Sequence, residues 1–334
     1  MTNTSTDHGA AQLPFATLDP ASIVRAIESM AFRVEGEPFA LNSYENRVYS
    51  FRDDEGARWV AKFYRPGRWS DEAILEEHQL LTHLHEGGVP VANVWRNAEG
   101  KSLFHVEGHR VAVFPHVVGR SPMLEDPDEL FALGQLIGQM HASATTVTLS
   151  HRPDFDPLRL CRESRETVLN SGKLSTQNRA DYEVVCKEII KAIESLKLPQ
   201  VSHIVTHNDC HPGNVLGHDG AYTLVDFDDC GHAPAIQDLW MFLSDPNEQG
   251  WRLQLSELIE GYEEFREFDR REIQWIEVLR TVRLMRHSAW ILDRWADPAF
   301  PQAFPWVKDE GYWHNHIREL EAQRVAMTPQ RWMA

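Results

Sequence analysis

The spacing of apolar residues changes along this chain, and the change constrains the fold more than any other feature. Strand-like segments containing Val48, Phe51 and Trp59 flank the turn-forming run Asp-Asp-Glu-Gly at 53–56 and predict a three-strand antiparallel meander within residues 41–64. Beyond residue 127 the spacing becomes mostly helical. Gly, Ser, Pro and Asp cluster just before that point, as is typical of a boundary. We therefore expect an α+β chain with a β-rich N-terminal lobe and a larger, mostly helical C-terminal lobe.

This boundary divides the chain into three predicted parts: a mobile tail over 1–18, an N-terminal lobe over 19–118 and a C-terminal lobe over 119–334. Asp19 and Pro20 begin a short helix, and Ser70 begins a second one that runs to about residue 86. The other expected elements are strands near 91–95, 102–105 and 111–117, helices at 127–143, 176–196, 235–244, 251–266 and 270–293, and short strands at 203–206, 214–216 and 222–227. A small sheet is thus expected inside the helical lobe.

Acidic residues outnumber basic ones by 50 to 33, which gives the 334-residue chain a net charge of −17. Nucleic-acid binding is not expected, because it needs a basic face. No apolar run approaches the roughly 18 residues of a membrane helix, and the first residues lack the apolar core of a signal peptide. A cytoplasmic protein without a membrane partner is expected. The acidic excess suits a cationic small substrate, or a divalent metal that carries an anionic one, and solubility alone also explains it.

One polar segment concentrates side chains that carry out chemistry. Residues 206–214 read Thr-His-Asn-Asp-Cys-His-Pro-Gly-Asn, and a hairpin-like connection leads on to Asp226. Asp209 and Asn214 are five residues apart in one loop and can converge with Asp226 at a strand end. Such oxygen donors suit Mg²⁺, which keeps waters and substrate phosphates in its remaining positions. A free carboxylate beside the ion can accept a proton from a substrate hydroxyl.

The pattern His207-x-Asp209 with Asn214 five residues on resembles the catalytic loop of the protein-kinase-like superfamily, and Asp-Phe-Asp at 226–228 resembles its metal-binding Asp-Phe-Gly. The resemblance implies a two-lobed kinase-like fold. It also implies that Asp209 is the catalytic base that orients the attacking hydroxyl. Asn214 and the catalytic Asp226 would hold Mg²⁺ on the phosphates of ATP, and His207 would position the loop.

The N-terminal lobe contains the partners that this superfamily requires. Lys62, in an apolar strand, matches the lysine that contacts the α- and β-phosphates. Its carboxylate partner should come from the helix at 70–86, where Glu77 lies on the apolar stripe and Glu76 does not. Glu77 is therefore the expected partner, and Glu76 is the reserve. The backbone that binds adenine in kinase hinges would correspond to Pro115, His116 and Val117.

Two departures place the chain within one branch of the superfamily. The turn at 41–49 contains no glycine, so Ser43 and its neighbours would contact phosphate, and no Ala-Pro-Glu or long activation segment follows Asp226. The chain is nearer the aminoglycoside and choline phosphotransferases, whose Asp-Leu motif resembles Asp238-Leu239; Asp238 would then brace the catalytic loop. Within that branch it is most similar to bacterial stress-response kinases, in tracts at 41–49, 62–66, 74–79, 233–241 and 295–301.

The closer likeness implies ATP-dependent phosphorylation of protein serine or threonine in a stress response. A small-molecule kinase acting on an amino-alcohol, sugar or antibiotic stays open, because the segment after Asp226 is short and the chain is acidic. A Zn²⁺-dependent hydrolase using His207, Asp209, His211 and Asp226 would leave Lys62 and Glu77 without a role. A non-catalytic nucleotide-binding scaffold would not need the full set of catalytic residues. A monomer is expected, because no heptad pattern favours a dimer.

Other conspicuous residues have simpler explanations. The cysteines are Cys161, Cys186, Cys210 and Cys230, which contain no C-x-x-C pair and are expected to be reduced thiols. Asp228 and Asp229 are either further metal or substrate ligands or acids of a solvent-facing loop. Five tryptophans near the C-terminus are expected to pack between helices rather than to enclose a quaternary ammonium group: Trp290, Trp295, Trp306, Trp313 and Trp332.

Overall fold

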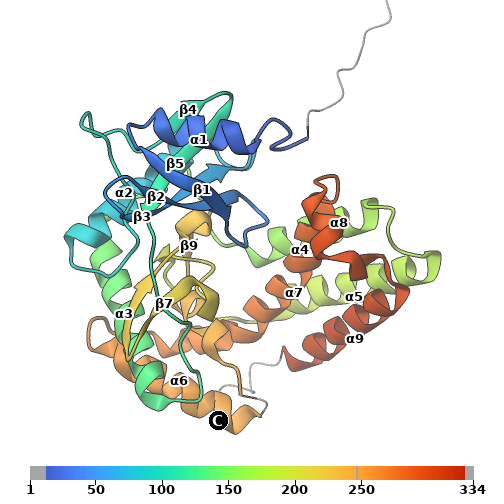
Figure 1. Cartoon of the computed structure of the whole chain (residues 1–334). Helices are drawn as coiled ribbons and strands as arrows, with labels where there is room; N and C mark the ends of the chain where they lie inside the picture. The colour runs from blue at the N-terminus through green and yellow to red at the C-terminus, as the bar shows by residue number, and fades with distance from the viewer. Residues whose placement is uncertain (1–12, 246, 328–334) are drawn as a thin grey trace, which may run out of the picture.

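The computed structural model describes residues 13–245 and 247–327, and its N-terminal lobe is built on a five-stranded antiparallel sheet in the order β1-β2-β3-β5-β4 (Figure 1). The strands are β1 (Val34–Ala40), β2 (Arg47–Asp53), β3 (Arg58–Tyr64), β4 (Phe104–Val106) and β5 (His109–Pro115). The predicted meander is present, but its first strand lies before residue 41. Residues 41–46 form a turn whose polar groups bond to other elements. Of the strand expected at 91–95, only a bridge from Val91 to Leu224 forms.

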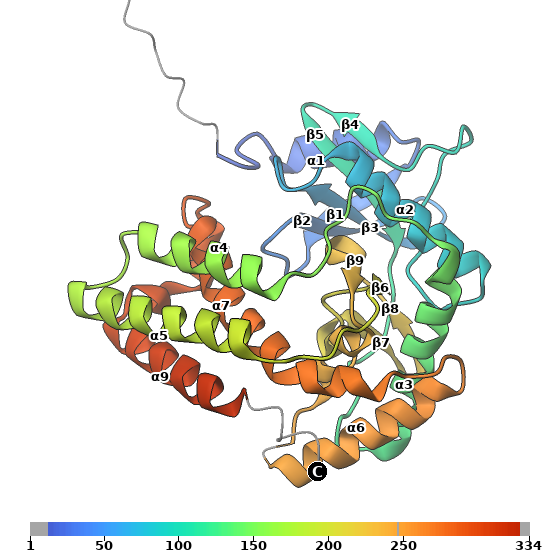
Figure 2. The same ribbon diagram turned by 180° about the vertical axis from the view of Figure 1, so that it is seen from behind.

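Most of the remaining chain is helical, as expected (Figures 1 and 2). The α-helices are α1 (Pro20–Glu28), α2 (Asp71–Glu86), α3 (Pro127–Ser143), α4 (Pro157–Asn170), α5 (Thr176–Ser195), α6 (Glu248–Glu263), α7 (Ile276–Asp293), α8 (Ala299–Ala303) and α9 (Glu310–Ala326). The sequence did not lead us to expect α4 or α9. The helix expected over 235–244 is wrong: two 3₁₀ turns occupy 235–238 and 240–242. There the Ile236 amide donates to the carboxylate of Glu272 rather than into a helix.

The sheet is buried on both faces around β5, as the packing of this strand shows. Val111 and Val113 belong to the core that includes residues of α1, whereas Ala112 and Phe114 belong to the core that includes residues of α2. Alternate residues of a strand point to opposite faces. Lys62 pairs with Ala112 across β3 and β5, so its side chain is on the α2 side of the sheet.

Local signals at both ends define α2. The Ser70 side chain accepts from the amide of Ala73, and the Gly87 amide donates to the carbonyl of His83. Within the helix, Glu77 is almost completely buried together with the apolar residues Ile74 and Leu81. This burial agrees with the helical spacing that placed Glu77 on the inward stripe.

Two small two-stranded sheets bring the polar loops of the C-terminal lobe together. The strands are β6 (Ile204–Thr206), β7 (Val215–His218), β8 (Ala221–Leu224) and β9 (Gly231–Ala233). Thr206 pairs with Gly231, and Val215 pairs with Leu224. The loops 207–214 and 225–230 therefore lie opposite each other, because strand pairs join them at both ends. Both loops lie below the large sheet in Figure 2.

Glycines allow α3 and α6 to pack with their backbones in contact. A Cβ added to Gly134 would lie 2.1 Å from the carbonyl oxygen of Leu258, and one added to Gly261 would lie 2.0 Å from that of Phe131. Real Cβ atoms do not approach backbone this closely, so both positions require glycine. The pair forms one wall of the C-terminal lobe. A second apolar core, which includes Tyr182 and Trp313, joins α4, α5, α7 and α9.

The ends of the chain and the boundary between the lobes are partly described. Of the tail expected over 1–18, residues 1–12 lie outside the described residues, whereas Phe15 is buried against the sheet. Trp332 also lies outside them. The sheet ends at Pro115 and α3 begins at Pro127, so irregular chain spans the predicted boundary. Within 13–245 and 247–327, no helix is both long and apolar enough to cross a membrane.

Candidate active site

The loop at 207–214 is held by a buried carboxylate from a later part of the chain. Asp238 is fully buried, and its oxygens accept hydrogen bonds from the backbone amides of His207 at 2.7 Å and Asn208 at 2.8 Å. His141 of α3 bonds the same carboxylate at 3.0 Å. Asn208 has a φ of +67°, a left-handed conformation that is costly for an L residue and that these bonds maintain. Asp238 thus lies where a brace for this loop was predicted.

Both ring nitrogens of the buried His207 have partners. Nε2 lies 2.9 Å from the carbonyl oxygen of Val225, and Nδ1 lies 3.4 Å from the backbone amide of Asp209. Because a carbonyl only accepts and an amide only donates, this network assigns a neutral ring with its proton on Nε2. The ring also packs on Phe227, with the centroids 4.4 Å apart. This environment suits a residue that positions the loop rather than one that carries a proton.

Asp209 lies between two basic side chains. Nη1 of Arg283 on α7 is 2.8 Å from Oδ1, and Nε2 of His211 is 3.6 Å from Oδ2. Burial opposes ionisation, but the contact with His211 and the charge of Arg283 together hold the pKa of Asp209 well below its usual range. A carboxylate with so low a pKa is a weak base. It therefore suits orienting a hydroxyl better than removing its proton early in a reaction.

Asn214 and Asp226 present oxygen atoms from the two facing loops. The Asn214 side-chain amide donates to the carbonyl of Asp209 at 3.0 Å, which fixes the orientation of that side chain. Asp226 has a φ of +60°, and its side chain is 52% exposed. One amide oxygen and one accessible carboxylate, with room for waters and phosphate oxygens, match the ligands that Mg²⁺ prefers. The residues present thus fit a divalent ion.

Lys62 is buried among three carboxylates. Its Nζ lies 3.0 Å from Asp226, 3.1 Å from Asp228 and 3.3 Å from Glu77. Burial alone would favour the neutral amine, but the charges of Asp226, Asp228 and Glu77 outweigh it and raise the pKa of Lys62 well above its usual value. The structure therefore brings together the lysine, the helix carboxylate and the first aspartate of Asp-Phe-Asp. It also places Asp228 in this cluster rather than on a solvent-facing loop.

Arg152 completes the surroundings of Glu77. This arginine is buried; its Nη2 lies 3.2 Å from Glu77, and its Nη1 donates to the carbonyl of Asp228 at 2.6 Å. Glu76, the reserve candidate, points elsewhere and accepts the backbone amides of Ser150 and His151 at 2.7 and 2.8 Å. The two neighbouring glutamates therefore have different tasks: Glu77 holds Lys62, and Glu76 holds the chain that carries Arg152.

The glycine-free turn that follows β1 is anchored at its base. Ser43 Oγ lies 3.4 Å from the carbonyl of Asn46, within the turn. The buried Asn46 accepts the Arg65 amide at 3.0 Å and donates to Asp228 at 3.3 Å. Side-chain hydrogen bonds thus hold the shape of this turn, whereas a glycine-rich phosphate-binding loop relies on the conformational freedom of glycine. Ser43 lies on this turn, where contact with phosphate was predicted.

The same turn is tied to the end of the helical lobe by a group of contacts that we call the clasp. Asp297 is buried and accepts from Arg47 at 2.8 and 2.9 Å and from Arg65 at 2.8 Å. Glu45 accepts from Trp290 at 2.5 Å and forms an ion pair with Arg294 at 2.6 Å. The residues of the clasp are Glu45, Arg47, Arg65, Trp290, Arg294 and Asp297. These contacts connect the two lobes on the open side of the site.

The predicted hinge is only partly available to a nucleotide. Pro115 has no amide proton, and the His116 amide already donates to the carbonyl of Arg58 at 3.2 Å. The Val117 amide has no hydrogen-bond partner within the described part of the chain. Of the three residues, Val117 is therefore the one with an uncommitted backbone donor.

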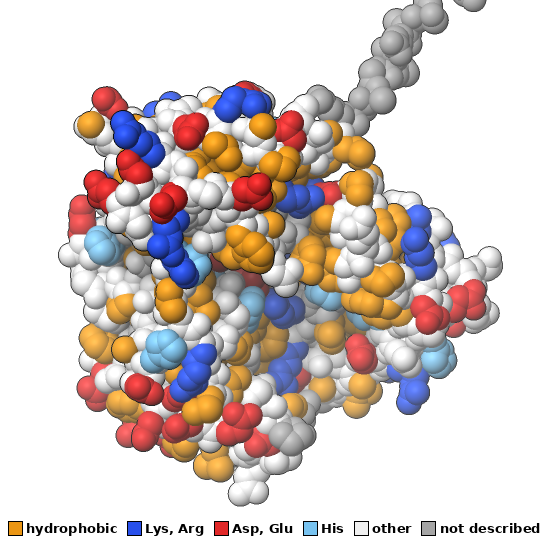
Figure 3. Space-filling model, in the orientation of Figure 1, with side chains coloured by type: hydrophobic (Ala, Val, Ile, Leu, Met, Phe, Trp, Pro, Cys, Tyr) orange, Lys and Arg blue, Asp and Glu red, His pale blue; other side chains and the backbone are white. Residues whose placement is uncertain are grey.

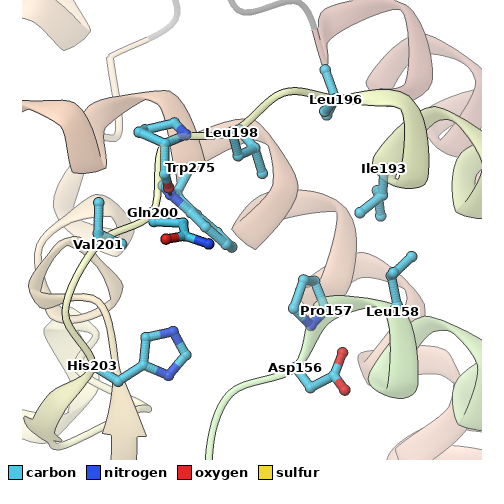
Figure 4. A pocket seen from close by; sticks show the side chains of 11 residues that line it. Asp156, Pro157, Leu158, Ile193, Leu196, Leu198, Gln200, Val201, His203 and Trp275 are labelled. Carbon is cyan, nitrogen blue, oxygen red and sulfur yellow. Dashed lines mark hydrogen bonds between the residues drawn. The ribbon is translucent and has the colours of Figure 1, made fainter.

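Other predicted features lie outside this cluster. All four cysteines are buried and free, in agreement with the reduced thiols expected from the sequence. No group of three His, Cys, Asp or Glu side chains within 13–245 and 247–327 could hold a metal ion. A pocket of about 470 Å³ between the start of α4, the end of α5 and Trp275 is lined by none of the predicted site residues (Figure 4).

Sequence reasoning missed several residues of the site. Arg283, Arg152 and His141 contact Asp209, Glu77 and Asp238 from distant positions, and no local motif announces them. A signal did exist for Asp297, because the tract 295–301 carried part of the resemblance.

With this geometry described, the chain can be compared with known proteins. A model of the phosphotransferase enzyme (APH) family matches residues 36–276. Stress response kinase A of Escherichia coli O157:H7 is 42% identical over 317 residues, which cover 94% of this chain and 95% of that protein. Serine/threonine protein kinase RdoA of Salmonella typhimurium is 39% identical over 317 residues, with the same coverage.

Solved structures show the same fold. An amicoumacin kinase in complex with AMP-PNP, Ca²⁺ and its antibiotic superimposes with a TM-score of 0.66 at 20% identity and covers 86% of this chain and 93% of that one. The family model spans most of the chain, and the curated relatives span nearly all of it. The chain therefore belongs to the phosphotransferase enzyme family.

Proposed function

We propose that this protein is an ATP- and Mg²⁺-dependent kinase that phosphorylates serine or threonine in another protein during a bacterial stress response. The names of relatives at 39% and 42% identity support both the acceptor and the stress response. The AMP-PNP and Ca²⁺ bound to the amicoumacin kinase, which shares the fold, support the use of a nucleotide and a divalent ion. A cytoplasmic monomer remains part of the proposal, and gel filtration tests the oligomeric state.

One observation carries the proposal: the loop of Asp226, which contacts Lys62, faces the loop of Asp209. Lys62 and Asp226 are in contact at 3.0 Å, and Asp226 follows β8, which pairs with β7 next to Asn214. Asp209 is held in the opposite loop by its neighbours His207 and Asn208. An anionic phosphate chain and a hydroxyl acceptor would therefore meet between the two loops.

Phosphoryl transfer depends mostly on positioning and on stabilisation of charge, and the residues can supply both. Glu77 and Asp228 hold the Lys62 ammonium in place, so that it can contact phosphate oxygens without first being ordered. Asp209 accepts the hydrogen bond of the acceptor hydroxyl and directs its oxygen toward the phosphoryl group. Mg²⁺, when bound by Asn214 and Asp226, would neutralise part of the phosphate charge.

The test is transfer of radiolabelled γ-phosphate from Mg-ATP to the protein itself and to a panel of serine- and threonine-containing proteins. We expect Asp209→Asn to lower the rate by roughly 10³-fold, a typical loss for a residue of this kind, and to keep ATP binding. Asp54→Asn, at an exposed acid of the β2–β3 turn, is the matched control.

Normal transfer by Asp209→Asn would overturn the assignment of this residue. Phosphorylation of an amino-alcohol, sugar or antibiotic, with no phosphoprotein formed, would overturn the protein acceptor and leave the phosphotransferase chemistry intact.

A further inference from the structure

The surface beside Asp209 is basic, although the chain as a whole carries a net charge of −17. Arg283, whose side chain is 47% exposed, and the exposed Arg286 lie within one turn of each other on α7. Figure 3 shows Lys and Arg side chains in the recess between the upper and lower parts of the molecule, in the region that α7 occupies in Figure 1. The acidic excess of the chain therefore lies largely elsewhere.

This face of α7 runs from the catalytic loop to the phosphate turn. At one end Arg283 contacts Asp209 at 2.8 Å, and at the other Trp290 donates to Glu45 of the turn at 2.5 Å. The ring of His287 stacks against Trp290, with the centroids 6.1 Å apart. Residues three and four apart share one helix face. Arg286 and His287 therefore lie between the loop that would orient the acceptor hydroxyl and the turn that would hold the donor phosphates.

The acids near this face are already paired with arginines. The pairs are Asp209 with Arg283, Glu45 with Arg65 and Arg294, Asp293 with Arg294, and Asp228 and Asp229 with Arg68. Arg286 has no carboxylate within ion-pair distance in residues 13–245 and 247–327. Arg283 uses one of its five N–H donors on Asp209 and remains accessible. The face thus offers positive charge that the protein itself does not neutralise.

We propose that this face binds the acceptor, and that the phosphorylated segment is an acidic peptide with Asp or Glu close to the target serine or threonine. The proposal rests on the proposed function, because it needs Asp209 to orient the acceptor hydroxyl. A carboxylate of the acceptor would pair with Arg286, and another would share the exposed guanidinium of Arg283. The same charges would repel a cationic acceptor such as an amino-alcohol or an aminoglycoside. The positive charge of this face therefore favours an anionic acceptor, whereas the net charge of −17 by itself suits a cationic one.

The test compares serine peptides of one sequence that differ only in flanking residues, which are Asp, Asn or Lys. For the unaltered full-length protein we expect kcat/KM to be about tenfold higher for the Asp peptide than for the Lys peptide, and this ratio to fall with added salt. Arg286→Glu should lower kcat/KM for the Asp peptide and raise it for the Lys peptide, mainly through KM. Arg318→Glu, at an exposed arginine of α9 rather than α7, makes the same change of charge outside this face and should leave the ratio unchanged.

The outcomes separate this inference from the proposed function. Equal rates for the Asp and Lys peptides, both abolished by Asp209→Asn, would overturn the acidic acceptor and leave the protein-kinase function standing. The same shift in Arg286→Glu and Arg318→Glu would show a general effect of charge and would also overturn the acceptor face. Labelling of a cationic small molecule, with no peptide labelled, would overturn both proposals.

Discussion

Removing the charge of Asp297 should both destabilise the protein and weaken its use of ATP. This carboxylate is 2% exposed and accepts hydrogen bonds from Arg47, Arg65 and the Ala299 amide. Burial opposes its ionisation, but the Arg65 and Ala299 hydrogen bonds and the Arg47 charge lower its pKa below the usual value. In Asp297→Asn the side chain keeps its shape and loses the charge that balances the two guanidinium groups.

The loss in the free energy of unfolding depends on the partners that the arginines beside Asp297 keep in the variant. Breaking a buried ion pair by removing one partner costs about 3–5 kcal/mol, because the remaining charge stays buried. Arg65 is 7% exposed and keeps Glu45 at 3.2 Å and the Tyr44 carbonyl at 3.1 Å, so the lower end of that range applies. We expect a loss of about 3 kcal/mol in the free energy of unfolding. The KM for ATP should rise about tenfold, because the turn that carries Ser43 loses its anchor.

Urea unfolding followed by tryptophan fluorescence at pH 7.5, together with the KM for ATP, measures both effects. Asp293→Asn is the matched control, because its side chain is 65% exposed and pairs with the neighbouring Arg294. An Asp297→Asn protein with an unchanged urea midpoint would refute the reasoning about the buried pair. A lower midpoint with an unchanged KM would show that the clasp holds the lobes together without positioning the phosphate turn.

Three further changes test other parts of the structure. Lys62→Met leaves three carboxylates facing one another, with Glu77 and Asp228 buried, so its melting temperature should fall below that of the unaltered protein by much more at pH 8 than at pH 5; equal deficits would contradict this. Burial raises the pKa of Glu272 to about 7, so the folded protein binds this proton more tightly than the unfolded chain does. The free energy of unfolding should therefore fall by up to roughly 3 kcal/mol as the pH rises from about 4.5 to 7. Glu272→Gln should remove that slope in urea titrations, and an unchanged slope would show that another group causes it. Gly134→Ala would place a Cβ 2.1 Å from the Leu258 carbonyl oxygen and should lower the free energy of unfolding by at least about 3 kcal/mol. Gly311→Ala is the control and should be well tolerated, because the nearest atom to its Cβ would be 3.4 Å away. Similar urea midpoints for the two variants would contradict the close packing of α3 and α6.

Local patterns in the sequence were enough to place the main elements of the nucleotide side. Helical spacing chose Glu77 as the partner of Lys62, and the structure pairs Lys62 with Glu77, although Glu76 is also buried, with other partners. Strand pairing around the turn at 53–56 placed Lys62 on the central strand β3. These predictions succeeded because each of them depended on residues that are close together in the sequence.

Contacts between distant residues could not be predicted in this way. Arg283 reaches Asp209 across 74 positions, and Arg47 reaches Asp297 across 250, so no periodicity connects either pair. The prediction of a helix over 235–244 was wrong for a related reason. Its composition favours a helix, but the Asp238 carboxylate and the Ile236 amide are committed to the catalytic loop and to Glu272, which keeps the backbone in 3₁₀ turns.

While the chain is being synthesised, the N-terminal sheet leaves the ribosome long before the residue that secures its phosphate turn. Asp297 follows Arg47 by 250 residues and lies beyond the region at 36–276 that the family model matches. At typical rates of about 5–20 residues per second, the turn waits roughly 12–50 s for its anchor. A nascent or C-terminally truncated chain without Asp297 therefore lacks the anchor of the turn that would hold the donor phosphates, and we expect no productive use of ATP before that residue has been synthesised.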